Sequence, residues 1–160
     1  MTSLGSLKSI KAVIFDFDGV FTTNSVFVDK YGHEIVECSR YDGYGIKMLS
    51  ELNIPSIIIS SEKVPIVNAR ADKLGIDAFA PINNKVNCAK NWVDSLNITL
   101  SQTAFLGNDI NDLPLLRKVG FPFCPCDAHK TVFHFSHRLL SMGGKGVVRE
   151  LCDLIKDSYT

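Results

Sequence analysis

Residues 11–19 read KAVIFDFDG, an apolar run that ends in two acidic residues and a glycine. The run is short and rich in residues that favour strands, and polar residues bound it on both sides. These features are typical of a strand buried on both faces, as in a parallel sheet. We therefore expect a buried strand whose carboxyl end presents Asp16 and Asp18.

The rest of the chain alternates between strand-like and helix-like patterns. Residues 25–38 alternate in polarity around a polar turn, which predicts a hairpin. The sequence further predicts helices over 42–52, 64–74, 85–96, from 113 onward and over 147–155, and strands over 55–60, 77–81, 103–107 and 121–124. This order predicts a single α/β domain over residues 1–160, built on a doubly wound parallel sheet. Asp42 opens the first helix, where we favour an N-cap over a contact with substrate.

Composition and charge exclude several classes of protein. Seventeen Lys and Arg balance 17 Asp and Glu, which argues against a nucleic-acid or membrane-surface coat protein. No apolar run approaches the roughly 18 residues of a membrane span, and the first ten residues lack the apolar stretch of a signal peptide. We expect a cytoplasmic protein whose ligand is a small molecule.

Polar side chains follow three of the predicted strands. Asp16 and Asp18 follow the first, Ser60 and Ser61 the second, and Asn108 with Asp109 a third. In doubly wound sheets, ligands bind where the carboxyl ends of strands meet. Two adjacent carboxylates repel each other unless a cation lies between them, and oxygen ligands without His or Cys favour Mg²⁺.

Lys85 begins a predicted helix and supplies a positive charge to this group. A carboxylate nucleophile, a hydroxyl donor, a lysine and Mg²⁺ together suit phosphoryl transfer through an aspartyl-phosphate. The pair of acids alone is weak evidence, since turn-capping acids produce the same pattern.

Two segments and two single residues, in fixed order, resemble the four motifs of the haloacid dehalogenase-like phosphatases: VIFDFDGVFT (13–22), Ser60, Lys85 and GNDIND (107–112). Three more, DGYGIKML (42–49), DAH (127–129) and GGKGVVRE (143–150), resemble its small capless branch. That branch dephosphorylates 3-deoxy-manno-octulosonate 8-phosphate and sialic-acid-type nonulosonate 9-phosphates. The resemblance implies a capless Rossmann-like fold with a hairpin flap after the first strand.

The resemblance also implies catalytic roles for individual residues. Asp16 is the expected nucleophile and an Mg²⁺ ligand. Asp18 is the expected general acid and base, and its backbone carbonyl would also reach the metal. Ser60 and Lys85 would bind the transferring phosphoryl oxygens. The remaining metal contacts and the residue that orients Lys85 would come from the last motif, namely from Asn108, Asp109 and Asp112.

Asn108 departs from the family, most of whose members carry Asp at this position. An asparagine keeps an oxygen ligand but loses a charge, so metal affinity should fall unless Asp109 compensates. A similar Gly-Asn pair occurs in phosphatase-like domains associated with CMP-sialic acid synthetase. A weakly active oligomerisation partner of such an acylneuraminate cytidylyltransferase is therefore an alternative to an enzyme.

A second departure is Ser61-Glu62-Lys63, where octulosonate phosphatases usually carry Gly-Arg. Glu62 with Lys73 resembles the nonulosonate 9-phosphate subgroup, in which Lys73 would offset the repulsion of the substrate's carboxylate. We therefore favour an N-acylneuraminate 9-phosphate or its deaminated analogue as substrate, with octulosonate 8-phosphate as the alternative. A solvated Glu62 and a surface Lys73 would produce the same sequence.

Two further segments carry expectations from the resemblance. Gly144, Lys145 and Arg149 belong to a segment that borders the site and would contact substrate. The hairpin over 25–38 resembles a flap at a tetramer interface, which implies a homotetramer, although ordinary hairpin packing is equally compatible with it.

Overall fold

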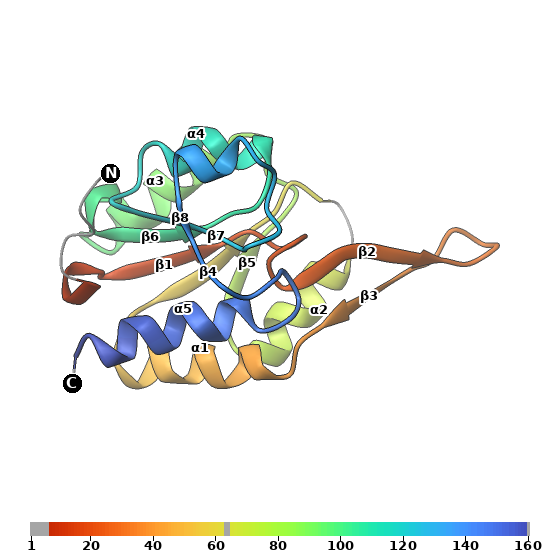
Figure 1. Cartoon of the computed structure of the whole chain (residues 1–160), viewed down its shortest axis with the longest axis horizontal. Helices are drawn as coiled ribbons and strands as arrows, with labels where there is room; N and C mark the ends of the chain where they lie inside the picture. The colour runs from red at the N-terminus through yellow and green to blue at the C-terminus, as the bar shows by residue number, and fades with distance from the viewer. Residues whose placement is uncertain (1–6, 63–64, 160) are drawn as a thin grey trace.

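The computed structural model describes residues 7–62 and 65–159 and contains a six-stranded parallel sheet in the order β5-β4-β1-β6-β7-β8 (Figure 1). Four of its strands are mostly buried: β1 (Ala12–Phe15), β4 (Ser56–Ile59), β6 (Thr103–Leu106) and β7 (Phe121–Cys124). β5 (Asp77–Phe79) and β8 (His137–Arg138) form the edges. The predicted doubly wound sheet is confirmed.

Helices cover both faces of this sheet (Figure 1). α1 (Tyr41–Glu51), α2 (Pro65–Leu74) and α5 (Val147–Asp157) lie on one face, and α3 (Lys85–Ser95) and α4 (Leu113–Leu116) lie on the other. Single turns of 3-10 helix connect elements: η1 (Leu7–Ser9), η2 (Leu100–Gln102), η3 (Ile110–Asp112) and η4 (Val132–His134). Each face has its own apolar core, around Phe15 and Phe123 on one side and Ile14 and Phe105 on the other. No helix among these residues is both long and apolar enough to cross a membrane.

The register of the central strands places the polar segments side by side. Phe15 of β1 pairs with Ile58 of β4 on one side and with Leu106 of β6 on the other. Because all three strands are parallel, the residues that follow them emerge at the same edge of the sheet.

A two-stranded hairpin lies outside the main sheet, between β1 and α1. It consists of β2 (Thr22–Val28) and β3 (Glu34–Cys38) and projects well beyond the rest of the fold (Figure 1). It begins three residues before the predicted start, because Thr22 already pairs with Cys38. Its apolar side chains are largely solvent-exposed, with Phe27 at 73% and Tyr31 at 74% exposure.

The predicted N-cap at Asp42 is wrong. α1 begins at Tyr41 with Arg40 as its N-cap residue, whose side chain makes no capping hydrogen bond; Ser39 Oγ accepts the Tyr41 N–H at 3.2 Å. Asp42 lies inside the first turn, where its carboxylate is fully buried 4.0 Å from the Arg70 guanidinium of α2. Neither carboxylate oxygen has a hydrogen-bond partner among the described residues.

Smaller differences concern element ends. The helix predicted from residue 64 begins at Pro65, and residue 64 lies outside the described part of the chain. The short edge strand β8 was not predicted, because two exposed residues leave no periodic pattern.

Candidate active site

A cleft of about 390 Å³ opens at the carboxyl edge of the central strands. Its lining comes from the loops that follow β1, β4 and β6, and from the start of the hairpin: Asp16, Asp18, Asn24, Ser60, Ser61, Glu62, Asn108, Asp109, Ile110 and Asn111. The three strand-end segments singled out in the sequence therefore do converge.

Lys85 joins two buried carboxylates beneath this cleft. Its Nζ lies 2.7 Å from Asp16 Oδ1 and 2.7 Å from Asp112 Oδ1, and all three side chains are almost completely buried. The other oxygen of Asp112 accepts the backbone N–H groups of Asn108, at 2.8 Å, and Asp109, at 3.4 Å. One chain of charge-assisted hydrogen bonds thus connects the loop after β1, the start of α3 and the loop after β6.

Burial changes the acidity of these groups. Burial, and then the neighbouring Asp112 carboxylate, raise the pKa of Asp16, while Lys85 opposes the shift. Burial alone would lower the pKa of Lys85, but the Asp16 and Asp112 carboxylates outweigh it and raise that pKa. Lys85 therefore stays charged at neutral pH, and two acids share one cation in a region where an unbalanced charge is costly.

Asp18 lies two residues further on and is partly exposed to the cleft. Its Oδ1 accepts a hydrogen bond of 3.3 Å from the Thr22 hydroxyl. Burial raises the pKa of Asp18, the Thr22 hydrogen bond lowers it, and the Glu62 carboxylate raises it further. A carboxyl group with a raised pKa suits proton donation near neutral pH.

Asn108 packs against the turn that contains Gly19. A Cβ at Gly19 would lie 1.8 Å from Asn108 Nδ2, so only glycine fits beneath this carboxamide. Asp109, in contrast, directs Oδ1 to its own turn, where it accepts the Ile110 N–H at 2.6 Å. Of the two residues, Asn108 is the one whose side chain is free of local hydrogen bonds with the described residues.

The donor set suits a hard divalent cation, although it is less acidic than three carboxylates would be. Asp16 and Asn108 line the cleft with side-chain oxygens, and the backbone carbonyl of Asp18 lies in the same loop as Asp16. Within residues 7–62 and 65–159, no three His, Cys, Asp or Glu side chains gather into a metal-binding group. Oxygen ligands still favour Mg²⁺ over softer metals, and a divalent cation would balance the second buried carboxylate.

The loop after β4 presents hydroxyl groups to the cleft. Ser60 Oγ accepts the Glu62 N–H at 3.1 Å, which fixes a tight turn at the end of the strand. Ser61 Oγ lies 3.5 Å from Asn111 Nδ2 across the cleft. Glu62 is exposed at the rim, beside these hydroxyls.

Within one chain, Lys73 does not reach this cleft. It lies in the last turn of α2 and is exposed, next to Leu74 at the amino edge of the sheet. Since α2 runs from the carboxyl edge back to the amino edge, its last turn and Glu62 lie at opposite ends of the helix.

The C-terminal segment also lies outside the cleft lining. Lys145 pairs with Glu37 of β3, and Arg149 Nε bonds Asp153 at 2.9 Å. A Cβ at Gly144 would lie 2.5 Å from the Thr22 carbonyl carbon, and the Gly144 N–H donates to the Val20 carbonyl. The glycine thus permits close packing on the loop after β1.

Sequence reasoning missed four residues of this region. Asn24, Ile110 and Asn111 line the cleft, and Thr22 bonds Asp18 beneath it. Ile110 and Asn111 lie inside the quoted GNDIND segment. Their position directly after Asn108 and Asp109 was a signal that they also lie at the site. Asn24 adopts φ 63°, and a polar Asn directly after a strand start was a weaker signal of a turn.

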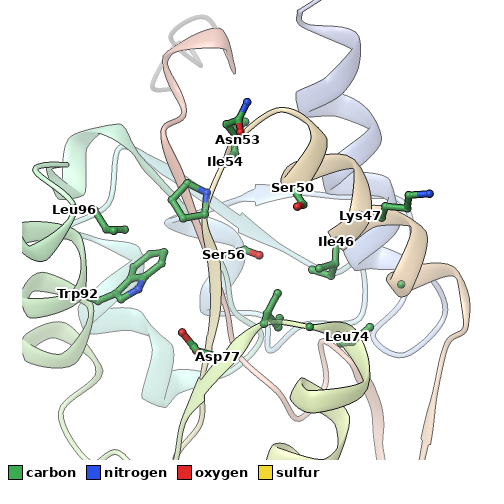
Figure 2. A pocket seen from close by; sticks show the side chains of 14 residues that line it. Ile46, Lys47, Ser50, Asn53, Ile54, Ser56, Leu74, Asp77, Trp92 and Leu96 are labelled. Carbon is green, nitrogen blue, oxygen red and sulfur yellow. The ribbon is translucent and has the colours of Figure 1, made fainter.

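A larger hollow of about 720 Å³ lies at the amino edge, between α1, α2 and α3 (Figure 2). Trp92 and Leu96 form one wall, and Ile46 and Leu74 face them across the start of β4. Lys47, a charged group on its rim, is highly exposed and lies 3.9 Å from Glu51. This hollow contains none of the buried carboxylates and lies at the edge of the sheet opposite to the catalytic groups.

Comparisons with known proteins identify the family of the chain. A family model described as haloacid dehalogenase-like hydrolase matches residues 61–149. The 3-deoxy-D-manno-octulosonate 8-phosphate phosphatase of Haemophilus influenzae is 36% identical over 152 residues, which cover 93% of this chain and 84% of that protein.

Two solved structures are similar along nearly the whole chain. The cobalt-bound deoxy-D-mannose-octulosonate 8-phosphate phosphatase of Haemophilus influenzae has a TM-score of 0.91 and 35% identity, covering 96% of this chain and 91% of that one. The 3-deoxy-D-manno-octulosonate 8-phosphate phosphatase of Moraxella catarrhalis, in complex with magnesium, phosphate and KDO, has a TM-score of 0.90 and 28% identity, covering 96% and 89%. The chain belongs to the haloacid dehalogenase-like hydrolases and is a capless phosphatase of that family.

Proposed function

We propose that this chain is a Mg²⁺-dependent phosphatase that removes phosphate from a nonulosonate 9-phosphate through an aspartyl-phosphate. The observation that carries the proposal is the buried Asp16 carboxylate, which Lys85 contacts at 2.7 Å at the floor of a cleft. Asp18 lies at the same strand end, with Glu62 at the rim.

In this mechanism Asp16 attacks the phosphorus atom, and the bond from phosphorus to the sugar oxygen breaks. Asp18 donates a proton to that oxygen, so the sugar leaves as an alcohol. Asp18 then removes a proton from a water molecule, which attacks the aspartyl-phosphate and releases inorganic phosphate. Lys85 and Ser60 bind the transferring oxygens, where positive charge and donors stabilise the transition state.

Mg²⁺ would bind the carboxylate of Asp16, the backbone carbonyl of Asp18 and the side-chain oxygen of Asn108. When bound, it would neutralise negative charge on the phosphoryl group. Asp109 is a weaker candidate, because one of its oxygens already accepts the Ile110 N–H.

The preference for a nine-carbon acid rests on Glu62. In the ring form, a nonulosonate has one more hydroxylated carbon between ring and phosphate than an octulosonate has. Glu62, beside Ser61 and Asn24 at the rim, supplies an acceptor for such hydroxyls or for an N-acyl group. Because Lys73 lies at the other end of α2, the preference stands on Glu62 without it.

Octulosonate 8-phosphate is the second candidate, favoured by the names of the similar proteins. Both acids carry a carboxylate, which Glu62 repels and an arginine at the rim would attract. At this position the two candidates differ in the extra hydroxyl or N-acyl group of the nine-carbon acid, for which Glu62 is an acceptor.

We also propose that copies of the chain cover the hairpin in a homotetramer. Val26, Phe27, Val28, Tyr31 and Ile35 expose a run of apolar surface on a hairpin that projects beyond the rest of the fold. Surfaces of this kind are typical of interfaces between subunits. The alternative is a cytidylyltransferase partner seated there.

The test is phosphate release with saturating Mg²⁺ from N-acetylneuraminate 9-phosphate, its deaminated analogue and octulosonate 8-phosphate. We expect the highest kcat/KM for a nine-carbon acid, and no release by the Asp16→Asn variant. Preference for the eight-carbon acid would overturn the substrate proposal but not the mechanism. No turnover of any ester would favour the partner alternative, which copurification with a cytidylyltransferase would support.

A further inference from the structure

The Thr22 hydroxyl is the centre of a small hydrogen-bond network beneath Asp18. Thr22 is fully buried at the start of β2. Its Oγ1 accepts the backbone N–H of Gly19 at 3.1 Å and that of Asn24 at 3.2 Å. The same oxygen lies 3.3 Å from Asp18 Oδ1.

The number of donors and acceptors on a hydroxyl group determines the direction of the third hydrogen bond. A hydroxyl group has two acceptor lone pairs and a single O–H donor. The two backbone N–H groups occupy both lone pairs, so the O–H can only donate, and Asp18 Oδ1 is its partner. Among the described residues, none hydrogen-bonds Asp18 Oδ2.

We propose that Thr22 is a positioning residue that determines which oxygen of Asp18 transfers the proton. Oδ1 is occupied by the Thr22 O–H, so the proton that Asp18 donates to the leaving group is carried on Oδ2. When Asp18 acts as a base, Oδ2 takes the proton back from water. This inference rests on the proposed role of Asp18 as general acid and base.

The turn around Gly19 explains why a hydroxyl is needed at this position. The N–H groups of Val20, Phe21 and Thr22 all point to the Phe17 carbonyl, which leaves the Gly19 N–H without a backbone acceptor. Thr22 therefore stabilises the loop and orients Asp18 with the same atom. A test must separate these two effects.

Three substitutions separate the two effects: Thr22→Val, Thr22→Ser and Asp18→Asn. Thr103→Val is the matched control. Thr22→Val keeps the shape and loses the hydroxyl, whereas Thr22→Ser keeps the hydroxyl. Thr103→Val removes the hydroxyl of another fully buried threonine, whose Oγ1 donates to the Thr99 carbonyl at the amino edge of the sheet. The readouts are kcat and KM for phosphate release from the sugar-acid phosphates, at a temperature where circular dichroism shows each variant folded.

We expect Thr22→Val to lower kcat by about 10- to 100-fold, part of the contribution of a general acid–base group, while KM changes little. Thr22→Ser should restore kcat to within about three-fold, and Thr103→Val should leave it unchanged. In an Asp18→Asn background, measured with 4-nitrophenyl phosphate as an ester with a better leaving group, Thr22→Val should have no further effect, because coupled residues are not additive.

Each contrary result has a separate meaning. Full kcat in Thr22→Val, or an equal loss with and without Asp18, would overturn the positioning role and leave the phosphatase mechanism intact. Full turnover in Asp18→Asn would overturn the proposed mechanism itself. Should Thr22→Val not fold, Thr22→Cys replaces it: its weak S–H donor should give a kcat between those of the wild type and Asp18→Asn, and wild-type kcat would count against the role.

Discussion

Asp112 contacts Lys85 at 2.7 Å with one carboxylate oxygen and accepts the N–H groups of Asn108 and Asp109 with the other. A Cβ at Gly107 would lie 2.7 Å from that second oxygen, so the loop after β6 is folded tightly around the Asp112 side chain. This carboxylate therefore sets both the position of the lysine and the shape of the loop that carries Asn108.

Asp112→Asn should lower kcat/KM by about 10-fold or more, because Lys85 loses one of its two carboxylate partners and shifts relative to the phosphoryl group. The matched control is Asp94→Asn, which breaks the exposed pair with Lys90 on α3. Steady-state phosphate release measures both variants. Equal activity in the two would mean that Asp16 alone orients Lys85.

Asn108→Asp should tighten Mg²⁺ binding, because it adds a charged oxygen at the cleft beside Asp16. The measurement is the Mg²⁺ concentration that gives half-maximal turnover, with calorimetric titration as a readout independent of activity. Asp109→Asn is the control. If that control weakens Mg²⁺ binding and Asn108→Asp has no effect, Asp109 is the ligand.

Glu62→Arg should shift preference from nine-carbon to eight-carbon acid phosphates, because arginine removes the acceptor for the extra hydroxyl or N-acyl group of a nine-carbon acid. The carboxylate that an arginine attracts is common to both acids. We expect the ratio of the two kcat/KM values to change by about 10-fold or more, the scale of a single charged contact. Lys73→Ala is the control and should leave the ratio unchanged, since Lys73 is exposed at the opposite edge. An unchanged ratio in Glu62→Arg would remove the basis for the nonulosonate assignment.

Asp42 should make the free energy of unfolding depend on pH. Burial raises its pKa to about 7 in the folded chain, and Arg70 only partly offsets this, whereas the ordinary value is 3.8. The folded state therefore binds the proton more tightly, and stability should fall as the pH rises from about 4 to about 7, by up to about 1.4 kcal/mol per pH unit.

Chemical denaturation across this pH range, with wild type and Asp42→Asn, checks the sign. The variant should lose this part of the pH dependence and be more stable than the wild type at pH 8, because asparagine stays neutral. A wild-type stability that rises from pH 4 to pH 7, with no difference in Asp42→Asn, would show that Arg70 keeps Asp42 ionised.

The fold was predictable because its strands are buried on both faces. The runs Ala12–Phe15 and residues 104–106 are continuous and apolar, as expected of strands in a sheet that is covered on both faces. β8 and the Asp42 side chain were not predictable in this way. β8 depends on pairing with β7, and the surroundings of Asp42 depend on how α2 packs beside α1.

The position of a site residue was predictable where the residue directly follows a strand. It was not predictable where it depends on the direction of a helix or on the geometry of a turn. Asp16, Ser60 and Asn108 follow strands, so the register alone brings them together. Lys73 lies one helix length from Glu62, and its distance from the cleft follows from the direction of α2. The role of Thr22 depends on where three other atoms lie in a turn, which no residue pattern encodes.

The most direct test of the central claim is to trap phosphate on Asp16. Acid quenching during the first turnover of a sugar-acid ester labelled at its phosphate should leave up to one labelled phosphate per chain. The label should be released by hydroxylamine, as expected of an acyl phosphate, and absent from Asp16→Asn. Rapid turnover without any label on the protein, together with an active Asp16→Asn variant, would contradict the account.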